Sequence, residues 1–315
     1  MIKSIKLENV PQSFARINPD GKFAQYKHLP YYADIITAHV QGFTKTCIDG
    51  KEYSLFTNGS SHTKDGLLIR KPDLDSKQYK KVKMPSGLNH PGGMQAIAQY
   101  VFVPCEYKPE SSLFVFDVSQ EDLPVVKSLH FGHAASSCGI TDFEYMGKTR
   151  YVIAVNANPT CYLYISEDTE TTDITKMDFI EIGQFDLTKF SGKDDDFEGV
   201  GLVTDVNNNI FLITLFSRKE YATLADYAML LGINVKTIEG QDIFQIKVDY
   251  YETKHLISHG AVGGEDGVHF RWGNGIYISE KQGLCIAGTA RNILSLGSTK
   301  LDTNTWPERD KENYS

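Results

Sequence analysis

Five glycines recur along the chain, and each follows a short polar stretch whose side chains could do chemistry. The glycines are Gly42, Gly93, Gly139, Gly199 and Gly273. The polar residues ahead of them are His39 and Gln41, Asn89 and His90, Ser136 and Ser137, Asp195, Asp196 and Glu198, and His269, Arg271 and Trp272. Three histidines and several carboxylates at equivalent points of a repeat predict one shared site, because a merely solvated surface does not require that convergence.

The residue types in this set suit two kinds of chemistry. The catalytic candidates are His39, His90, Glu198, His269 and Arg271. Histidine and glutamate could carry protons while arginine holds an anionic group of the ligand. Histidines with a carboxylate could instead bind a divalent metal ion, and no local motif decides between the two. The metal candidates are His39, His90, His269 and Asp196. The substrate-binding candidates are Gln95, Ser137, Asp196 and Trp272.

Each of these residues, taken alone, also has a structural explanation. A histidine at the start of a strand is commonly a hydrogen-bonding partner, and the mouth of a closed β-structure is polar because water fills it. The sequence contains no glycine-rich phosphate loop, nucleophile elbow or HExxH motif. The predicted site therefore depends on several distant strands meeting at one end of the fold.

The elements that position these residues are predicted to be the blades of an all-β, five-bladed β-propeller. Successive recurrent glycines are 51, 46, 60 and 74 residues apart, which is typical of blades joined by loops of uneven length. The clearest unit runs from Asn89 to Ser119 and contains three strand-like segments. A two-sheet β-sandwich is the competing fold, but it does not predict recurrent groups of three strands.

The second strand of each unit is apolar almost throughout. These segments are YSLFT, YVFVP, YVIAV, IFLITLF and LCIAGTA. Strands buried on both faces have this composition, and a propeller buries each blade between two neighbours. Four turns, IDGKE, YMGKT, VNNNI and EKQGL, place Gly or Asn at a hairpin position that favours positive φ.

Two further segments complete the predicted fold. Ser4–Val10 has strand-like alternation but no partner of its own, so we expect it to close the last blade, with Pro11–Tyr32 as a loop. Residues 217–232 carry Ser217 and Glu220 at capping-box spacing, an apolar stripe and a final glycine, which predicts one helical insertion in the fourth blade. We expect that helix to lie over the channel mouth as a lid.

Composition narrows the class of protein. The chain has 315 residues, 41% hydrophobic, which fits a single domain over residues 1–315. A formal net charge of −8 disfavours binding to nucleic acid, whose phosphates require a basic surface. No apolar run is long enough to cross a membrane. We therefore expect the partner to be a small-molecule ligand. Five widely spaced cysteines and the lack of an apolar leader block predict reduced thiols and a cytoplasmic location. The oligomeric state stays open.

The repeats, and the segment NHPGGMQ followed by an apolar strand and SLFVFDVS, resemble five-bladed β-propeller proteins. That group includes carboxylate-using glycosidases, metal-dependent nucleotidases, sugar-binding lectins and propeller proteins of no established activity. The resemblance covers most of the chain as architecture. It implies the fold, but it offers no catalytic motif that transfers to individual residues here.

Two functions follow from these observations. The first is an enzyme, a hydrolase or lyase, that acts on a small polar or anionic molecule at the channel mouth through histidine and carboxylate groups, with or without a metal ion. The second is a non-catalytic module that binds a glycan, peptide or protein partner across the mouth face. An enzyme should gather several of the candidate side chains around one point, whereas a binding module should leave them scattered.

Overall fold

The computed structural model describes residues 2–31, 38–60, 64–107, 109–167, 171, 173–192, 195–220, 223–237, 244–260, 267–291 and 300–309. Two short helices are present in these ranges, α1 (Val10–Ala15) and α2 (Thr188–Ser191), and no described helix is long and apolar enough to span a membrane. The strands are β1 (Lys22–Tyr26), β2 (Val40–Ile48), β3 (Lys51–Asn58), β4 (Leu67–Lys71), β5 (Lys80–Lys83), β6 (Gln95–Ile97), β7 (Tyr100–Tyr107), β8 (Glu110–Asp117), β9 (Val125–Phe131), β10 (Ser137–Tyr145), β11 (Lys148–Ala157), β12 (Thr160–Ser166), β13 (Phe179–Asp186), β14 (Asp196–Thr204), β15 (Ile210–Glu220), β16 (Thr223–Thr237), β17 (Phe244–Leu256), β18 (Val268–Ser279), β19 (Gly283–Ala290) and β20 (Leu301–Pro307).

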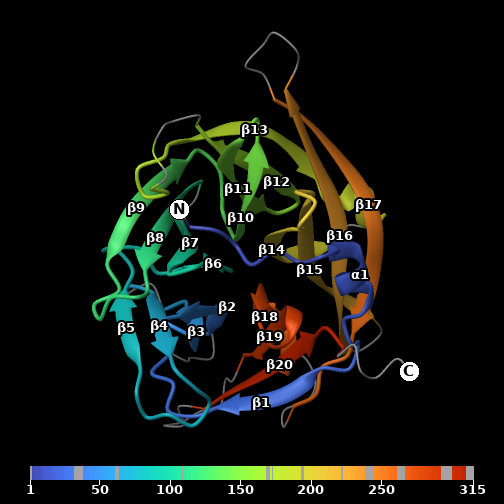
Figure 1. Cartoon of the computed structure of the whole chain (residues 1–315). Helices are drawn as coiled ribbons and strands as arrows, with labels where there is room; N and C mark the ends of the chain where they lie inside the picture. Colours follow the sequence, from blue (N-terminus) through green and yellow to red (C-terminus); the bar gives the residue numbers. More distant parts are fainter. Residues whose placement is uncertain are drawn as a thin grey trace.

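The strands form curled sheets around a central axis, so the fold is all-β and propeller-like (Figure 1). Three sheets of the described chain are antiparallel four-stranded meanders, β6 to β9, β10 to β13 and β14 to β17. A further sheet has the order β1-β20-β19-β18-β2-β3-β4-β5, and its halves meet at one parallel pair, Asn274 with Gly42. Strands β2, β6, β10, β14 and β18 lie nearest the axis in Figure 1. The alternative of two facing sheets is therefore wrong.

The strands that follow the inner strands are buried on both faces, as their apolar sequences predict. Side chains of β7, β11, β15 and β19 are buried along most of each strand. The hairpin turns also have the predicted backbone: φ is 50° at Asp49 and 74° at Gly50, and 50° at Met146 and 78° at Gly147. Two successive residues with positive φ match the twist of the flanking strands, as in type I′ turns.

The recurrent glycines lie where the inner strands approach one another closely. A Cβ atom at Gly199 would lie 1.9 Å from the side-chain Oδ1 of Asn274. A Cβ atom at Gly92, next to the recurrent Gly93, would lie 1.9 Å from the carbonyl oxygen of Ser136. Both distances are far inside van der Waals contact, so these positions accept only glycine unless neighbouring atoms move.

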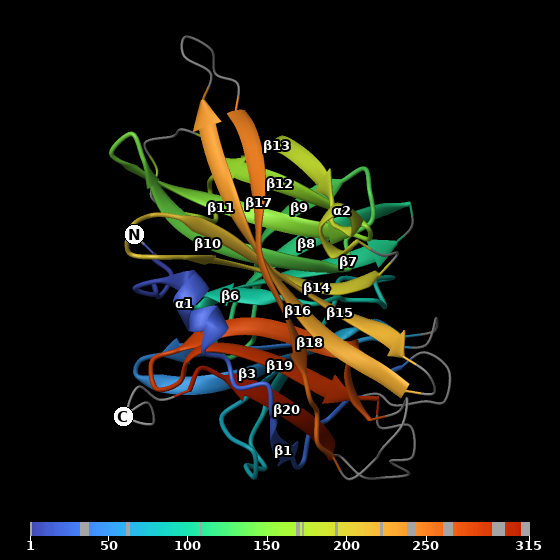
Figure 2. The same ribbon diagram turned by 90° about the vertical axis from the view of Figure 1, so that its right-hand side faces the viewer.

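The predicted helix over residues 217–232 is wrong, because this segment forms the hairpin of β15 and β16. Ser217 pairs with Asp226 across the hairpin, and β16 lies between β15 and β17 in the sheet. Residues 221–222 lie outside the described part of the chain. The run from 228 to 233 is buried, and a continuous apolar run fits a helical stripe and a buried strand equally well. In Figure 2, β16 and β17 extend beyond the other strands, and the predicted lid no longer has a basis.

The strand that closes the last sheet is β1, and not Ser4–Val10 as predicted. β1 pairs antiparallel with β20, with Phe23 opposite Asn304. Within Ser4–Val10, only a single bridge forms among the described residues, between Leu7 and Asp205. An N-terminal strand does complete the sheet, but it comes from the stretch that the sequence predicted to be a loop.

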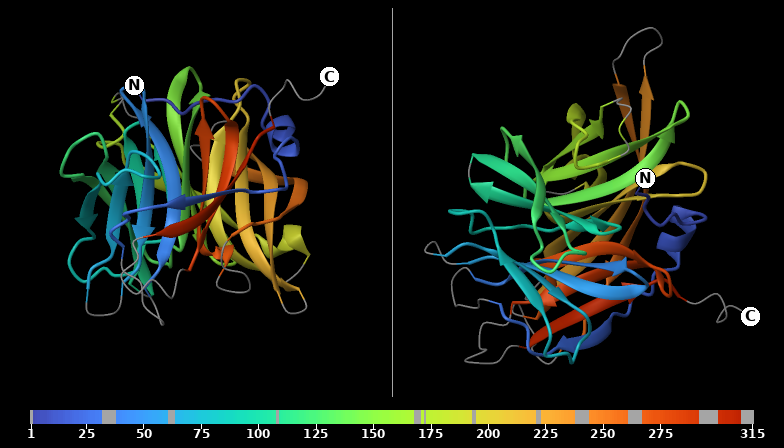
Figure 3. Two further views of the ribbon diagram at one scale, coloured as in Figure 1. Left: turned by 90° about the horizontal axis from the view of Figure 1, so that it is seen from below. Right: turned by 60° about the vertical axis from the view of Figure 1, so that its left-hand side comes forward.

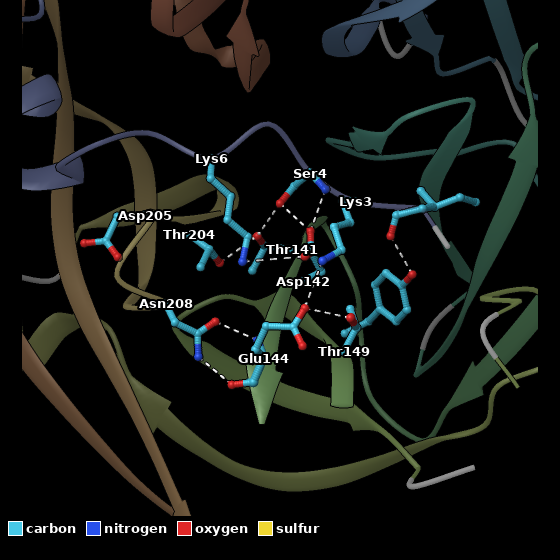
Figure 4. Close-up of polar contacts among 12 residues, drawn as sticks. Lys3, Ser4, Lys6, Thr141, Asp142, Glu144, Thr149, Thr204, Asp205 and Asn208 are labelled. Atoms are coloured by element: carbon cyan, nitrogen blue, oxygen red, sulfur yellow. Dashed lines mark hydrogen bonds and ion pairs between the residues drawn. The ribbon is translucent and has the colours of Figure 1, made fainter. Parts of the chain in front are cut away.

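Residues 2–9, here called the N-terminal strap, cross the end of the ring at which the inner strands finish (Figures 3 and 4). The backbone N–H and the hydroxyl of Ser4 both donate to Oδ1 of Asp142, each at 2.5 Å. The ammonium of Lys6 lies 3.7 Å from Oδ2 of the same carboxylate. The strap ends at Asn9, whose side chain accepts an N–H from the first turn of α1 and so caps that helix.

The five cysteines are free thiols, as predicted, with Cys47 exposed and the other four buried. Burial raises the pKa of Cys105 and of Cys285 to about 12, so both stay protonated at neutral pH. A buried, protonated thiol is a poor nucleophile, which leaves packing as the role of these residues.

Candidate functional site

Three inner strands carry a β-bulge just ahead of their recurrent glycine. The pairing register shifts between Val40 and Gly42 in β2, between Phe197 and Gly199 in β14, and between His269 and Gly273 in β18. A bulge leaves a residue unpaired in the ladder and re-aims its side chain. The residues inside the bulges are Gln41, Glu198 and residues 270–272. We call this end of the ring the bulge mouth, and the opposite end, crossed by residues 2–9, the strap mouth.

Glu198 is half-buried, and its pKa is raised to about 8. Burial is the main cause, because it removes water from the ionised carboxylate, and the negative charge of Asp196 acts in the same direction. Arg271 opposes these effects by favouring the carboxylate, and Asp226 adds to them. A carboxyl group with a pKa of about 8 is protonated at neutral pH, so Glu198 can donate a proton.

His269 is buried and is held by a carboxylate. Its Nδ1 lies 3.0 Å from Oδ2 of Asp226, which is 2% exposed. The other oxygen of Asp226 accepts a bond of 2.6 Å from the hydroxyl of Ser217 and one of 3.2 Å from the backbone N–H of Phe270. A carboxylate fixed by two other donors orients the imidazole ring and keeps its proton on Nδ1, which places the ring's lone pair on Nε2.

Trp272 has cations and a histidine ring around its indole. The guanidinium carbon of Arg271 lies 5.0 Å from the ring centre, and that of Arg291 lies 4.6 Å from it. The ring of His39 meets the indole edge to face, with centroids 5.5 Å apart and planes at 86°. These distances are those of cation–π and aromatic contacts, so Trp272 positions at least one charged side chain at the bulge mouth.

His90 is exposed and belongs to a different part of the rim. The side-chain amide of Gln41 donates to its Nε2 at 3.1 Å, and its Nδ1 lies 3.8 Å from Oε2 of Glu106. Gln41 is on β2 and Glu106 is on β7. These contacts place His90 beside β2 and β7, whereas Glu198 and Arg271 come from β14 and β18.

The acidic run ahead of Gly199 is divided between two partners. Asp195 is buried and accepts two bonds from Arg218, of 2.8 and 2.6 Å, in a fork. Asp196 is exposed and accepts a bond from the side-chain amide of Asn158. Two adjacent carboxylates thus differ in burial and in charge compensation, although the sequence presents them as one acidic run.

Gln95 and Ser137, two predicted substrate-binding residues, are both buried. The amide of Gln95 donates to the carbonyl of Leu202 at 2.9 Å, and its oxygen accepts the N–H groups of Leu202 and Ile140. Gln95 therefore ties β6, β10 and β14 together and uses its amide within the protein. The hydroxyl of Ser137 has no hydrogen-bond partner among the described residues, and a Cβ atom at Gly93 would lie 2.9 Å from Cβ of Ser137.

The structure brings together part of the predicted set. Glu198, His269 and Arg271 gather where β14, β16 and β18 meet, with Trp272 beside them, whereas His90 lies elsewhere on the rim. No group of three or more His, Cys, Asp or Glu side chains among the described residues could hold a metal ion. The predicted metal candidates, three histidines and Asp196, therefore do not assemble as such a group.

Sequence reasoning missed Asp226 as the partner of His269, and Ser217 as a donor to Asp226. Both lie in the segment that was predicted to be a helix, and a helix does not pair Ser217 with Asp226 as the β15–β16 hairpin does. The available signal was an aspartate inside an otherwise apolar run, since a buried carboxylate needs donors and usually marks a paired site. Arg291 was missed because it lies eighteen positions after its recurrent glycine, in another strand region.

A cavity of about 670 Å³ lies at the strap mouth, and its lining residues do not include those of the three bulges. Residues of the strap and of β2, β6 and β18 line it, including Ser4, Lys45, Gln95 and Tyr277. Beside the bulge of β14, Asn274 of β18 packs against Gly199. The two mouths are therefore distinct places on the molecule.

Comparison with known proteins adds little to this description. No family model matches the sequence, and a search of curated proteins finds no match. Among solved structures, the fold is similar to an endo-arabinase from Bacteroides thetaiotaomicron VPI-5482, with a TM-score of 0.45 and 10% sequence identity over 92% of this chain and 99% of that chain. A likeness at this level says nothing about activity, so function must be argued from the site.

Proposed function

We propose that this protein is an enzyme that acts on a small polar or anionic molecule at the bulge mouth by acid–base catalysis. The observation that carries the proposal is an electrostatic link between a proton donor and an oriented proton acceptor: Glu198, with its pKa of about 8, feels the charge of Asp226, the carboxylate that holds His269. Titratable groups whose environments give them different protonation states are a recurring feature of acid–base sites.

Each residue has a stated role in the proposal. Glu198 is the general acid and gives its proton to the leaving atom of the substrate. His269 is the general base, because the bond from its Nδ1–H to Asp226 orients the ring and puts the lone pair of the neutral imidazole on Nε2. Arg271, whose charge reaches Glu198, binds the polar or anionic part of the ligand.

Hydrolysis is the reaction that these groups suit best. The base takes a proton from a water molecule as its oxygen attacks, and the acid gives a proton to the leaving group, so the protein returns to its starting state after one proton passes from His269 to Glu198 through solvent. A lyase would use the same pair, with a C–H bond of the substrate in place of the water.

The proposed scaffold for this site is a five-bladed propeller. Support comes from the eight-stranded sheet. Its two halves are joined by one residue pair, between β18 and β2, whereas the adjacent strands β2 and β3 of one half form eight residue pairs. Taken as separate blades, these halves and the three four-stranded sheets make five. A single domain over residues 1–315 and a cytoplasmic location stay predictions.

Turnover of a panel of small esters, phosphate esters, amides and glycosides by the whole chain tests the proposal. We expect hydrolysis of one class, and a loss of about 100-fold or more in Glu198→Gln, since that is the usual contribution of a general acid. Glu252→Gln, on the outer strand β17, is the matched control and should keep wild-type turnover. Equal turnover in Glu198→Gln and wild type would refute the role of Glu198, and binding without turnover would favour the non-catalytic module.

A further inference from the structure

Two positively charged side chains share one indole ring at the bulge mouth. Arg271 and Arg291 lie 5.0 and 4.6 Å from the centre of Trp272, and both distances are within the range of cation–π contacts. Two like charges around one ring repel each other unless an anion compensates them. The arrangement therefore favours a negatively charged neighbour.

The described carboxylates of this mouth do not compensate Arg271. Asp195 is bound by Arg218, Asp196 accepts from an amide, and Asp226 is occupied by His269. Glu198 feels the charge of Arg271, but it forms no ion pair with it. The guanidinium of Arg271 is exposed and makes no side-chain hydrogen bond or ion pair with any described residue, so its donors face solvent.

We infer that Arg271, stacked on Trp272 and assisted by Arg291, forms a subsite for a carboxylate or phosphate group of the ligand. A guanidinium binds either group through two parallel N–H bonds, and stacking on an indole holds its plane before the ligand arrives. The inference rests on the proposed function and narrows its ligand from a polar or anionic molecule to an anionic one.

The subsite would also place the ligand for the proposed chemistry. An anion held at Arg271 lies within electrostatic range of Glu198, because the charge of Arg271, on β18, lowers the pKa of Glu198, on β14. The negative charge of that anion disfavours ionisation of Glu198, so ligand binding and the protonated state of the acid support each other. Specificity for an anionic ligand and the protonated state of Glu198 thus both depend on the anion that Arg271 binds.

Tryptophan fluorescence gives a direct test. The chain has two tryptophans, and Trp306 is fully buried, so a ligand at the bulge mouth should change the emission of Trp272. The folded chain is titrated with sodium phosphate and, separately, with sodium succinate, at an ionic strength held constant with sodium chloride. We expect a saturable change with at least one of the two anions, and its loss in Trp272→Phe. A response to phosphate alone assigns a phosphate group, and one to succinate alone assigns a carboxylate.

Substitutions of Arg271 decide whether the subsite is responsible. Arg271→Gln should weaken the anion affinity about tenfold or more, and Arg271→Lys should fall between it and wild type because it keeps the charge and loses the fork. Arg309→Gln, whose arginine bonds Asn18, is the matched control and should bind as wild type does. No saturable response in wild type, or equal affinity in Arg271→Gln and wild type, would overturn the subsite.

Glu198→Gln separates this inference from the proposed function. That variant should keep anion binding and lose turnover, because it alters the proton donor and not the guanidinium. Saturable anion binding that depends on Arg271, without turnover of any substrate, would refute the proposed enzyme and support the subsite. Turnover that depends on Glu198, together with anion binding that is unchanged in Arg271→Gln, would refute the subsite and support the proposed enzyme.

Discussion

Two buried aspartates, one at each mouth of the ring, have similar burial and different neighbours. Asp142 at the strap mouth is 0% exposed and accepts two hydrogen bonds, and Asp226 at the bulge mouth is 2% exposed and accepts three. The donors to Asp142 are the backbone and hydroxyl of Ser4, with Lys6 as an ionic partner (Figure 4). The donors to Asp226 include the ring of His269.

The difference lies in what each carboxylate orients. Asp142 anchors the N-terminal strap. The neighbouring Lys3 and Glu144 also form an ion pair, at 3.0 Å, so the charged groups at this point hold the strap to β10. Asp226 orients a ring that can take up a proton, beside a carboxyl group that is protonated at neutral pH. Burial of a paired carboxylate thus stabilises the fold at one mouth and prepares proton transfer at the other.

The largest expected effect is on turnover in Asp226→Asn. The amide cannot accept the Nδ1 proton in the same way, so His269 loses its orientation, and we expect turnover of the identified substrate to fall about 100-fold or more. Asp142→Asn, equally buried, is the control and should keep wild-type turnover. Steady-state kinetics of both variants measure the contrast, and equal losses would erase the distinction between the two mouths.

The strap mouth should show its effect in stability. Asp142→Ala leaves the N–H and hydroxyl of Ser4 without their acceptor, and we expect it to lower the free energy of unfolding by about 1–3 kcal/mol. Glu144→Ala breaks only an exposed ion pair and should cost less than about 1 kcal/mol. Urea denaturation compares the two variants, and similar costs for both would mean that the strap is not anchored by Asp142.

The pH dependence of stability should carry the signature of Glu198. Its pKa rises from 4.5 to about 8 on folding, so between these pH values the folded state binds more protons than the unfolded state. Stability therefore falls as the pH rises through this window, and Glu198→Gln should remove that part of the slope and be the more stable protein at pH 9. Thermal melts from pH 5 to pH 9 measure it. Parallel curves for the variant and wild type would contradict the raised pKa.

The smallest expected effect is that of His90→Ala. The ring is exposed, so its removal leaves no core cavity and should change the free energy of unfolding by less than about 1 kcal/mol. Because its contacts lie on β2 and β7, turnover should fall less than in Asp226→Asn. Thermal melts and kinetics on one preparation provide both values. Complete loss of turnover in His90→Ala would mean that the active site also includes the part of the rim at β2 and β7.

Local patterns predicted the elements whose environment is set by neighbouring residues. The apolar second strands and the positive-φ turns depend on a few adjacent positions, and both were confirmed. The hairpin at 217–232 was mispredicted because a run of buried residues has no period that separates helix from strand. Pairing of β1 with β20 joins segments nearly 280 residues apart, which no local pattern specifies.

The candidate site divides in the same way. Glu198, Arg271 and Trp272 could be selected from the sequence because they precede recurrent glycines, and a repeat places equivalent residues at one end. Asp226 could not be selected, because its contact with His269 exists only when β16 lies beside β18 in the folded chain. The separate location of His90 also depends on which inner strands are neighbours.

By itself, the sequence determined that the chain builds repeated β-units with glycines at their closest approach, since backbone geometry and two-sided burial act over a few residues. Only the tertiary structure decided which polar groups meet, because two bulges turn Glu198 and residues 270–272 out of their ladders and burial then raises the pKa of that glutamate. Protonation depends on desolvation and on charges from other strands, and those are properties of the assembled fold.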